Sequence, residues 1–454
     1  MDSNNLISLY SPKFCETWTK VNLYKQATWK NGFAFKQKHF SQKGKPIIKI
    51  VELKRGITNQ TGRTLEVLDE AYYLKQGDML FTWSGSPDTS INTFWYLFEE
   101  EGWLNQHIFK ITPNSDINSI FFFYVMKYIN PNFISIAKNK QTTGLGHVTV
   151  ADIKNFTISI PNLYIQKKIA HILSTLDDKI ELNLKMNQTL EEMAQSLFKS
   201  LFVDFDPVHA KANASSNADY DQIAKELGIS REVLDLFPDE IEESELGMIP
   251  KGWDISIIGN SFELLGGFAF KSTSYDKTGE FGLATIKNVQ NGNFVEECTN
   301  HISKIPEKMK KYCRLESGDI LLSLTGNVGR VCIVPKGKYL LNQRVSKIIA
   351  RKNTPYSLCY FYFRSPQVFK EMISIAKGTA QLNLSPIEIS KLIMIEPDKT
   401  LLANVGYIFD NFYSKLIANN NQIQALKKTR NILLPKLLSG KLDVSELDIG
   451  HVDH

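Results

Sequence analysis

The stretch Asn31-Gly-Phe-Ala-Phe-Lys36 returns as Gly266-Gly-Phe-Ala-Phe-Lys271, 235 residues further along the chain. Other short stretches return in the same order: Pro12 and Trp18 as Pro250 and Trp253, Leu74–Leu80 as Leu315–Leu321, Leu104–Gln106 as Leu341–Gln343, and Pro161 as Pro397. Solenoid repeats have periods of about 20–50 residues, so this period is far too long for one. The sequence therefore predicts a duplicated domain of roughly 200 residues.

Each copy begins with a globular part that we expect to be mixed α/β (α+β). Strand-like runs bounded by turn residues occur at Pro46–Val51 and Asp319–Leu324. Phe33 and Phe35 alternate with small or polar residues, as do Phe268 and Phe270 in the second copy, which predicts core-facing strand positions. Longer apolar runs, predicted to be buried helix, lie at Phe121–Met126 and Leu358–Phe363.

The second part of each copy is a long helix with a coiled-coil seam. Residues 166–203 contain no Pro or Gly, and apolar residues recur there every three or four positions. The residues expected to pair the helices are Leu173, Leu176, Ile180, Asn183, Asn187 and Leu190 in the first helix and Leu416, Asn420 and Ile423 in the second. Asn at a seam position fixes register, so its recurrence favours pairing between the two helices. The alternative is that each helix packs only on its own domain.

These features divide the chain into six segments. They are a first globular domain at 12–163, a first long helix at 164–203, an acidic linker at 204–247, a second globular domain at 248–397, a second long helix at 398–438 and a tail at 439–454. If the two helices of about 38 residues pair antiparallel, each about 57 Å long, they would hold the two domains apart in a pseudo-two-fold arrangement. Such an arrangement would act as a ruler.

Charge is distributed unevenly along the chain. Twelve acidic and three basic residues give 204–247 a charge of −9, which leaves +14 for the rest of a chain whose net charge is +5. A basic body suits an anionic partner, although a solvated surface would show the same balance.

The sequence contains no recognisable motif of a catalytic or metal site. There is no G-x-x-x-x-G-K-[ST] phosphate loop, and Gly144–Gly146 lacks the third glycine of a dinucleotide loop. Asn130–Phe133 departs from the Asn-Pro-Pro-Phe pattern of adenine methyltransferases and is expected to be a loop. The 8 histidines never stand at ligand spacing. Five unpaired cysteines, no secretory signal and no membrane-length apolar run favour a cytoplasmic protein.

Polar and basic residues instead stand beside turns at equivalent points of both copies. Asn, Gln, Arg, Ser and Thr read base edges, and Lys suits phosphate, so these positions are candidate DNA contacts. In the first copy they are Lys36, Lys38, His39, Ser84, Gln106, His107, Lys140, Gln141 and Thr142. In the second copy they are Lys271, Ser272, Thr325, Asn327, Arg330, Gln343, Arg344, Thr379, Gln381 and Asn383. A repeated scaffold with different loop residues is what reading two different short sequences requires.

Seven motifs together resemble the specificity subunit of type I restriction–modification enzymes. They are Leu246–Trp253, Gly267–Lys271, Gly318–Leu321, Leu341–Gln343, Asn187–Ala194, Ser200–Pro207 and Ile432–Gly440. The first copy departs from the pattern, because Trp83-Ser-Gly-Ser86 stands where the second copy has Leu324-Thr-Gly326.

The resemblance implies a non-catalytic subunit with two target recognition domains. Each would bind one half of an asymmetric, bipartite site in double-stranded DNA, and the paired spacer helices would dock two methyltransferase subunits and, through them, nuclease–translocase subunits. S-adenosylmethionine, Mg²⁺ and ATP would be used by those partners and not bound by this chain. Two other readings stay open: a self-contained DNA-modifying enzyme with a degenerate site, and a coiled-coil scaffold that touches no DNA.

Overall fold

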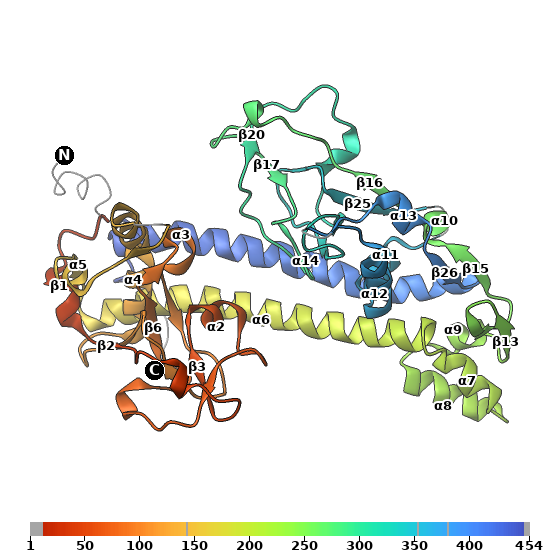
Figure 1. Cartoon of the computed structure of the whole chain (residues 1–454), viewed down its shortest axis with the longest axis horizontal. Coiled ribbons are helices and arrows are strands. Elements are labelled where there is room, and N and C mark those ends of the chain that lie inside the picture. The colour runs from red at the N-terminus through yellow and green to blue at the C-terminus, as the bar shows by residue number, and fades with distance from the viewer. Residues whose placement is uncertain (1–11, 142–143, 352–353, 379–380, 449–454) are drawn as a thin grey trace. The chain divides into compact units, whose positions relative to one another are not determined.

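The computed structural model describes residues 12–141, 144–351, 354–378 and 381–448. The chain divides into two compact units, and Figure 1 labels many of their elements. Unit 1 holds the residues up to Lys179 together with those from Leu426 onward, and unit 2 holds Ile180–Ala425. Each unit contains the globular part of one repeat and a portion of both long helices, α6 (Leu163–Phe202) and α14 (Lys399–Leu438).

Two four-stranded sheets form the globular part of unit 1. The antiparallel sheet has the order β2 (Ala27–Asn31), β10 (Ile108–Pro113), β6 (Met79–Thr82), β8 (Asn92–Trp95). The second sheet has the order β4 (Arg63–Thr64), β3 (Lys45–Ile48), β9 (Gly102–Leu104), β5 (Tyr73–Leu74), with β3 and β9 parallel. The other elements are β1 (Thr19–Asn22) paired with β12 (Thr157–Ile160), β7 (Ser84–Gly85) paired with β11 (Gly146–His147), and helices α2 (Ile50–Arg55), α3 (Pro87–Ser90), α4 (Ser119–Asn139) and α5 (Val150–Lys154).

Unit 2 repeats this topology. Its antiparallel sheet has the order β16 (Phe262–Gly266), β25 (Val345–Ala350), β22 (Ile320–Ser323), β23 (Val331–Ile333). Its second sheet has the order β20 (His301–Ile302), β17 (Phe281–Ala284), β24 (Tyr339–Leu341), β21 (Arg314–Leu315), and β17 and β24 are parallel. The other elements are β15 (Asp254–Ile257) paired with β26 (Ile393–Glu396), β18 (Val289–Gln290) paired with β19 (Asn293–Phe294), and helices α10 (Ile258–Ser261), α11 (Tyr356–Arg364), α12 (Pro366–Ile375) and α13 (Pro386–Ser390). The predicted duplication of a mixed α/β domain is confirmed.

The predicted strands are shorter than the sequence suggested. The run Pro46–Val51 is strand only as far as Ile48, because the Lys49 N–H donates to the buried Glu52 carboxylate (3.0 Å) and this bond starts α2. The Phe33 and Phe268 segments make only isolated bridges, to Asn105 and Asn342. Both segments connect the antiparallel sheet to the second sheet of their domain, and neither forms a regular ladder with a neighbouring strand.

Asn130–Phe133 is not a loop, as the sequence suggested, but part of α4. Pro131 removes one backbone donor inside this helix, which ordinarily breaks it. Ile129 and Phe133 are both fully buried in the core of unit 1, so packing on either side of the proline holds the helical backbone in place.

Both long helices contain 40 residues, which corresponds to about 60 Å at 1.5 Å per residue. They begin at matching caps. Asn162 Oδ1 accepts from the Ile165 N–H (3.0 Å), and Asp398 Oδ1 accepts from the Thr400 N–H (2.7 Å). A side-chain acceptor at this position satisfies a helix N–H that has no partner within the helix.

The helices pair antiparallel through polar side chains in unit 2. Asn183 Nδ2 donates to Gln422 Oε1 (2.9 Å), and Asn187 Nδ2 donates to Asn420 Oδ1 (2.8 Å). Asn419 Nδ2 completes the set with a bond to Asn187 Oδ1 (2.9 Å). In unit 1 the two helices are joined by an ion pair, in which Arg430 Nη1 lies 2.5 Å from Asp177 Oδ1. Of the expected pairing residues, Leu173, Ile180, Asn183, Leu416 and Ile423 are buried, and Leu176, Asn187, Leu190 and Asn420 are partly buried.

Each helix also belongs to the hydrophobic core of the domain that the other repeat encodes. Ala194, Phe198 and Leu201 near the end of α6 lie in the core of the second domain. Leu437 and Leu438 at the end of α14 lie in the core of the first domain. Pairing between helices and packing on a domain are therefore not alternatives, since each helix does both.

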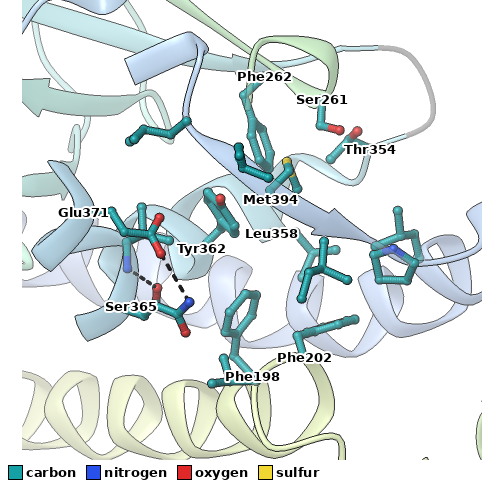
Figure 2. Close-up of a pocket in the computed structure, with 18 of the residues that line it drawn as sticks. Phe198, Phe202, Ser261, Phe262, Thr354, Leu358, Tyr362, Ser365, Glu371 and Met394 are labelled. Atoms are coloured by element: carbon teal, nitrogen blue, oxygen red, sulfur yellow. Dashed lines mark hydrogen bonds between the residues drawn. The ribbon is translucent and has the colours of Figure 1, made fainter. Parts of the chain in front are cut away.

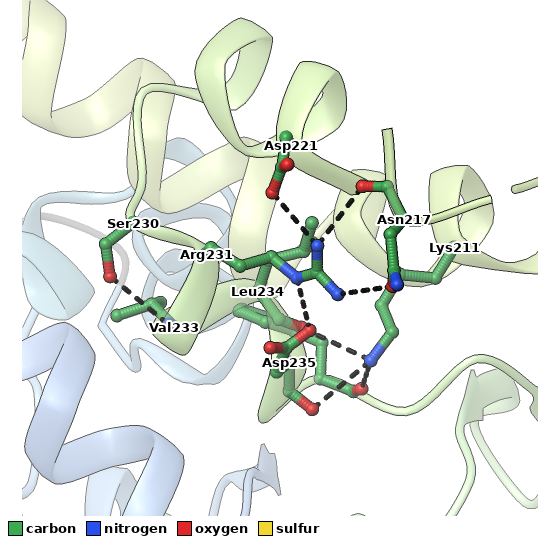
Figure 3. A network of polar contacts seen from close by, with 9 residues as sticks. Lys211, Asn217, Asp221, Ser230, Arg231, Val233, Leu234 and Asp235 are labelled. Carbon is green, nitrogen blue, oxygen red and sulfur yellow. Dashed lines mark hydrogen bonds and ion pairs between the residues drawn. The ribbon is translucent and has the colours of Figure 1, made fainter. Parts of the chain in front are cut away.

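The segment 204–247, expected to be a linker, is folded. It forms α7 (Asp206–Ala212), α8 (Asn217–Leu227), α9 (Arg231–Asp235) and a hairpin of β13 (Ile241–Ser244) and β14 (Gly247–Pro250). Phe205 and Phe237 pack on Trp253, with ring centroids 5.6 and 6.2 Å away. Figure 3 shows Arg231 between Asp221 and Asp235, at 2.9 and 2.8 Å. Apolar residues spaced through an acidic sequence thus join this connector to the hydrophobic core of the second domain.

A buried ion pair ties α6 to the second domain. The Arg364 guanidinium binds the Glu191 carboxylate, and the two side chains are 14% and 15% exposed. The Tyr360 hydroxyl donates to Glu191 Oε2 (2.9 Å). Glu191 therefore has both a cation and a neutral donor, as a buried carboxylate requires.

We expect Arg364→Ala to lower the free energy of unfolding of unit 2 by about 3–5 kcal/mol, because Glu191 would stay buried without its cation. Arg430→Ala is the matched control. Its pair with Asp177 is more exposed, at 29% and 32%, so its loss should cost about 1 kcal/mol or less. Amide hydrogen exchange measures opening of the two units separately. Equal losses for both variants would contradict the assignment of the Glu191 pair as the stronger one.

Candidate nucleic-acid interface

Three loops meet at one edge of the antiparallel sheet in each domain. Loop cluster 1 consists of residues 83–86, 106–107 and 146–147. The Trp83 N–H donates to the His107 carbonyl (3.1 Å), the Val148 N–H donates to the Trp83 carbonyl (2.8 Å), and Ser84 pairs with His147 in the β7–β11 ladder. These bonds bring three segments that are distant in sequence into one surface.

Loop cluster 2 is the equivalent in the second domain and consists of residues 324–327, 343–344 and 381–383. The Leu324 N–H donates to the Arg344 carbonyl (2.9 Å), and the Leu384 N–H donates to the Leu324 carbonyl (2.7 Å). Thr325 and Asn383 form the bridge that corresponds to Ser84 and His147. The backbone framework of the site is therefore the same in both domains.

The framework depends on a close backbone contact that only glycine permits. A Cβ atom on Gly32 would lie 1.9 Å from the Asn105 carbonyl oxygen, and one on Gly267 would lie 2.2 Å from that of Asn342. This contact fixes the Leu-Asn-Gln segment of each copy. His107 and Arg344, the residues that follow it, both have positive φ, at 74° and 72°.

The side chains on this framework differ between the domains. In loop cluster 1 the Trp83 ring lies 5.1 Å from the His107 ring, and Trp83 Nε1 donates to Asn31 Oδ1 (2.9 Å). Burial lowers the pKa of His107, so its imidazole is neutral at physiological pH and offers one donor and one acceptor. This cluster is aromatic and uncharged.

Loop cluster 2 carries a cation and amides instead. Arg344 Nη1 lies 3.4 Å from Thr325 Oγ1, which in turn bonds Asn383 Oδ1 (2.8 Å). Arg344 is exposed, and Gln381 and Asn383 are exposed beside it. Since one contact uses one guanidinium donor, the remaining donors of Arg344 are available to a ligand.

The structure brings only part of the predicted set together. Ser84, Gln106 and His107 lie in loop cluster 1, and Thr325, Asn327, Gln343, Arg344, Gln381 and Asn383 lie in loop cluster 2. His39 is nearby, with its ring 5.4 Å from Phe33, whose carbonyl accepts from the Gln106 N–H. Thr142 and Thr379 lie outside the described residues.

The remaining candidates lie apart from the clusters or have partners within the protein. Lys140 is paired with Asp152 (2.6 Å), and Arg330 donates to Gln290. The others, Lys36, Lys38, Gln141, Lys271 and Ser272, are exposed in or beside the 3₁₀ turns and helix ends that flank the clusters. Lys140 is thus held by Asp152 on the protein surface, where its side chain is 38% exposed.

Three residues at this site were missed by the sequence analysis. They are Trp83 and His147 of loop cluster 1 and Asn31, which accepts from Trp83. Their repeat partners are Leu324, Asn383 and Gly266. A comparison of the two repeats could have found them, because the residue type at each of these positions differs between the copies although the surrounding backbone is the same.

A separate apolar pocket of about 440 Å³ lies in unit 2 and contains no residue of loop cluster 2. Figure 2 shows Phe198 and Phe202 of α6 on one side and Leu358, Tyr362 and Met394 around them. Its few polar groups are Ser261, Thr354, Ser365, Gln367 and Glu371. The pocket is suited to apolar groups and not to an anion.

Across the residues that the structure describes, no group of three or more His, Cys, Asp or Glu is arranged to hold a metal ion. Over the same ranges, the helices are too short or too polar to cross a membrane.

Comparison with known proteins gives one consistent answer. The model of the type I restriction modification DNA specificity domain matches the chain twice, at residues 15–192 and 250–431. The chain is 28% identical over 370 residues to the HindI specificity subunit of Haemophilus influenzae, covering 73% of this chain and 79% of that one. It is 23% identical over 457 residues to the EcoBI specificity subunit of Escherichia coli, covering 97% and 88%.

A solved structure shares the fold. The type I restriction–modification S subunit from M. genitalium superposes with a TM-score of 0.51 at 15% identity, covering 95% of this chain and 97% of that one.

We expect Gly267→Ala to destabilise the second domain by about 1–3 kcal/mol, because the new methyl group would overlap the Asn342 carbonyl. Gly266→Ala is the matched control, since a Cβ there meets nothing within 4 Å, and it should change stability by less than about 0.5 kcal/mol. Thermal unfolding and hydrogen exchange of peptides 262–270 and 341–346 provide the measurement. A neutral Gly267→Ala would show that the close contact is not required.

Proposed function

The chain belongs to the family of type I restriction–modification specificity subunits, and from this premise we propose that it binds a bipartite, asymmetric sequence in double-stranded DNA. Each domain reads one half of that sequence. Members of this family are non-catalytic recognition components, so the chemistry resides in partner subunits. The observation that carries the proposal is one backbone framework present twice with different side chains on it.

The side chains suit base edges. Arg344 can donate two bonds to the O6 and N7 of a guanine, and Gln or Asn can pair with both edge atoms of an adenine. Loop cluster 1 offers the neutral His107 beside Trp83, which has different hydrogen-bonding groups. The two clusters therefore select different bases, and the combined site is asymmetric.

Electrostatics supports binding to the duplex. The chain outside 204–247 carries +14 and the folded connector carries −9. Positive charge attracts phosphate, and the acidic connector disfavours contact between DNA and its own part of the surface. Affinity should fall as salt rises, because each phosphate contact releases counterions.

The two long helices serve as the spacer that sets the gap between the half-sites. The Asn187–Asn420 and Asn183–Gln422 bonds fix one register, because a slip would leave these amides without partners in the seam. A fixed register gives a fixed gap, and insertion of four residues near Asn183 would change it by about 6 Å, or about two base pairs.

The enzymatic partners are two methyltransferase subunits and, through them, nuclease–translocase subunits that use S-adenosylmethionine, Mg²⁺ and ATP. They act with this chain in the cytoplasm, where its five free cysteines remain reduced. An apolar surface suited to a methyltransferase subunit surrounds the pocket of unit 2. The exposed residues Leu246 and Ile393 line this pocket, and Ile393 pairs in the β15–β26 ladder with Ile257, which is also exposed. Exposed apolar residues gathered in this way mark a protein interface.

Exchange of one domain tests the two-reader proposal. Residues 12–161 are replaced by the corresponding domain of a relative with a different target, and the chain is assembled with its partner subunits. Selection from random-sequence duplex DNA should then return a site with one half changed and the other half retained. A change in both halves would contradict independent reading. The unmodified chain is the control, and its failure to select any bipartite site would contradict the proposed function itself.

Ile393→Asp tests the docking surface. This side chain is 49% exposed, so a carboxylate there should leave stability within about 0.5 kcal/mol of the original while opposing burial in an interface. We expect at least a tenfold loss of affinity for the methyltransferase subunit, measured by calorimetry or co-purification. Val67→Asp, at a position 90% exposed in the other unit, is the control and should bind normally. Normal binding by the Ile393 variant would exclude this surface.

A further inference from the structure

Left-handed backbone occurs at the same place in both copies without glycine. His107 and Arg344, at equivalent positions after Leu-Asn-Gln, have φ of 74° and 72°. A side chain in this conformation brings Cβ close to the following carbonyl, which glycine avoids. Two copies whose loop sequences have diverged thus both retain a residue that is unfavourable for the backbone.

The fold itself does not need these two side chains. The backbone contribution of each residue is a carbonyl that accepts from Trp83 or Leu324, and glycine would supply the same acceptor. Both side chains are exposed, and neither belongs to a hydrophobic core. The presence of His107 and Arg344 at these positions, in place of glycine, is therefore not explained by the stability of the fold.

Phe205 provides an internal comparison. It is the third non-glycine residue with positive φ among those the structure describes, at 55°. Its ring is 8% exposed and packs on Trp253 at 5.6 Å, so burial in the core accounts for the side chain there. His107 contacts the partly buried Trp83 ring at 5.1 Å and Arg344 contacts Thr325 at 3.4 Å, but neither side chain belongs to a hydrophobic core as Phe205 does.

We propose that His107 and Arg344 are the principal base-reading residues, one in each domain, and that the left-handed backbone projects their side chains from the loop clusters toward the DNA. This inference rests on the proposed function. Arg344 reads a guanine through its O6 and N7, because a guanidinium offers two parallel donors. The neutral His107, with one donor and one acceptor, reads a different base edge. Strained backbone retained at matching sites is typical of functional positions.

Glycine substitutions separate this role from a structural one. Arg344→Gly and His107→Gly remove the side chain and also remove the strain, so each variant should be as stable as the original protein or more stable. The full chain is assembled with its partner subunits and presented with duplex DNA of random sequence. We expect Arg344→Gly to lose about 10- to 100-fold of the preference at one base pair of the second half-site, and to leave the first half-site unchanged. His107→Gly should show the reverse pattern.

Two further variants sharpen the test. Arg344→Lys keeps the charge but not the paired donors, so it should retain affinity while losing most of the guanine preference. Phe205→Gly should lower stability, because its ring is buried, and leave base preference unchanged.

Each outcome supports or overturns the inference. A position-specific loss of preference in a stable protein supports it. Unaltered preference in both glycine variants overturns it, as does unfolding of either variant or an equal loss at all positions of both half-sites. If the unmodified complex selects no bipartite site, the proposed function itself is wrong. If the unmodified complex selects a bipartite site and the glycine variants select the same one, only this inference is wrong.

Discussion

The antiparallel pairing of two helices through amide side chains is the constraint on which the rest of this protein depends. Amide side chains in a helix seam weaken the pairing but permit few registers, because each must find its partner. The Asn187–Asn420 bond joins residues from equivalent points of the two repeats. Each helix also completes the core of the domain that the other repeat encodes, through Phe198 in one case and Leu437 in the other. Neither repeat can therefore reach its observed packing alone.

Duplication followed by divergence explains how one backbone framework carries two different loop clusters. The parallel strand pair, the glycine contact at Gly32 and Gly267, and the left-handed turn are all repeated. The side chains on this common framework differ, as His107 does from Arg344. A rigid framework holds those side chains in position, so a substitution there can alter recognition without altering stability.

The connector shows that charge and folding are separate properties of a segment. An acidic composition suggests a solvated linker, yet Phe205, Phe237 and Trp253 pack together and Arg231 lies between two carboxylates. A few apolar residues at suitable positions are enough to order such a segment when a neighbouring surface covers them.

The sequence by itself determined the duplication, the mixed α/β class, the two long helices and their polar seam, because repeated motifs and helical periodicity are local signals. It also placed Arg344, His107 and Asn383 among the site residues, because they stand at turns. Only the tertiary structure decided which candidates meet. Lys140 is bound to Asp152, and Asn31 joins Trp83 across 52 positions of the chain. Pairing between distant segments depends on sheet topology, which no local pattern of residues encodes.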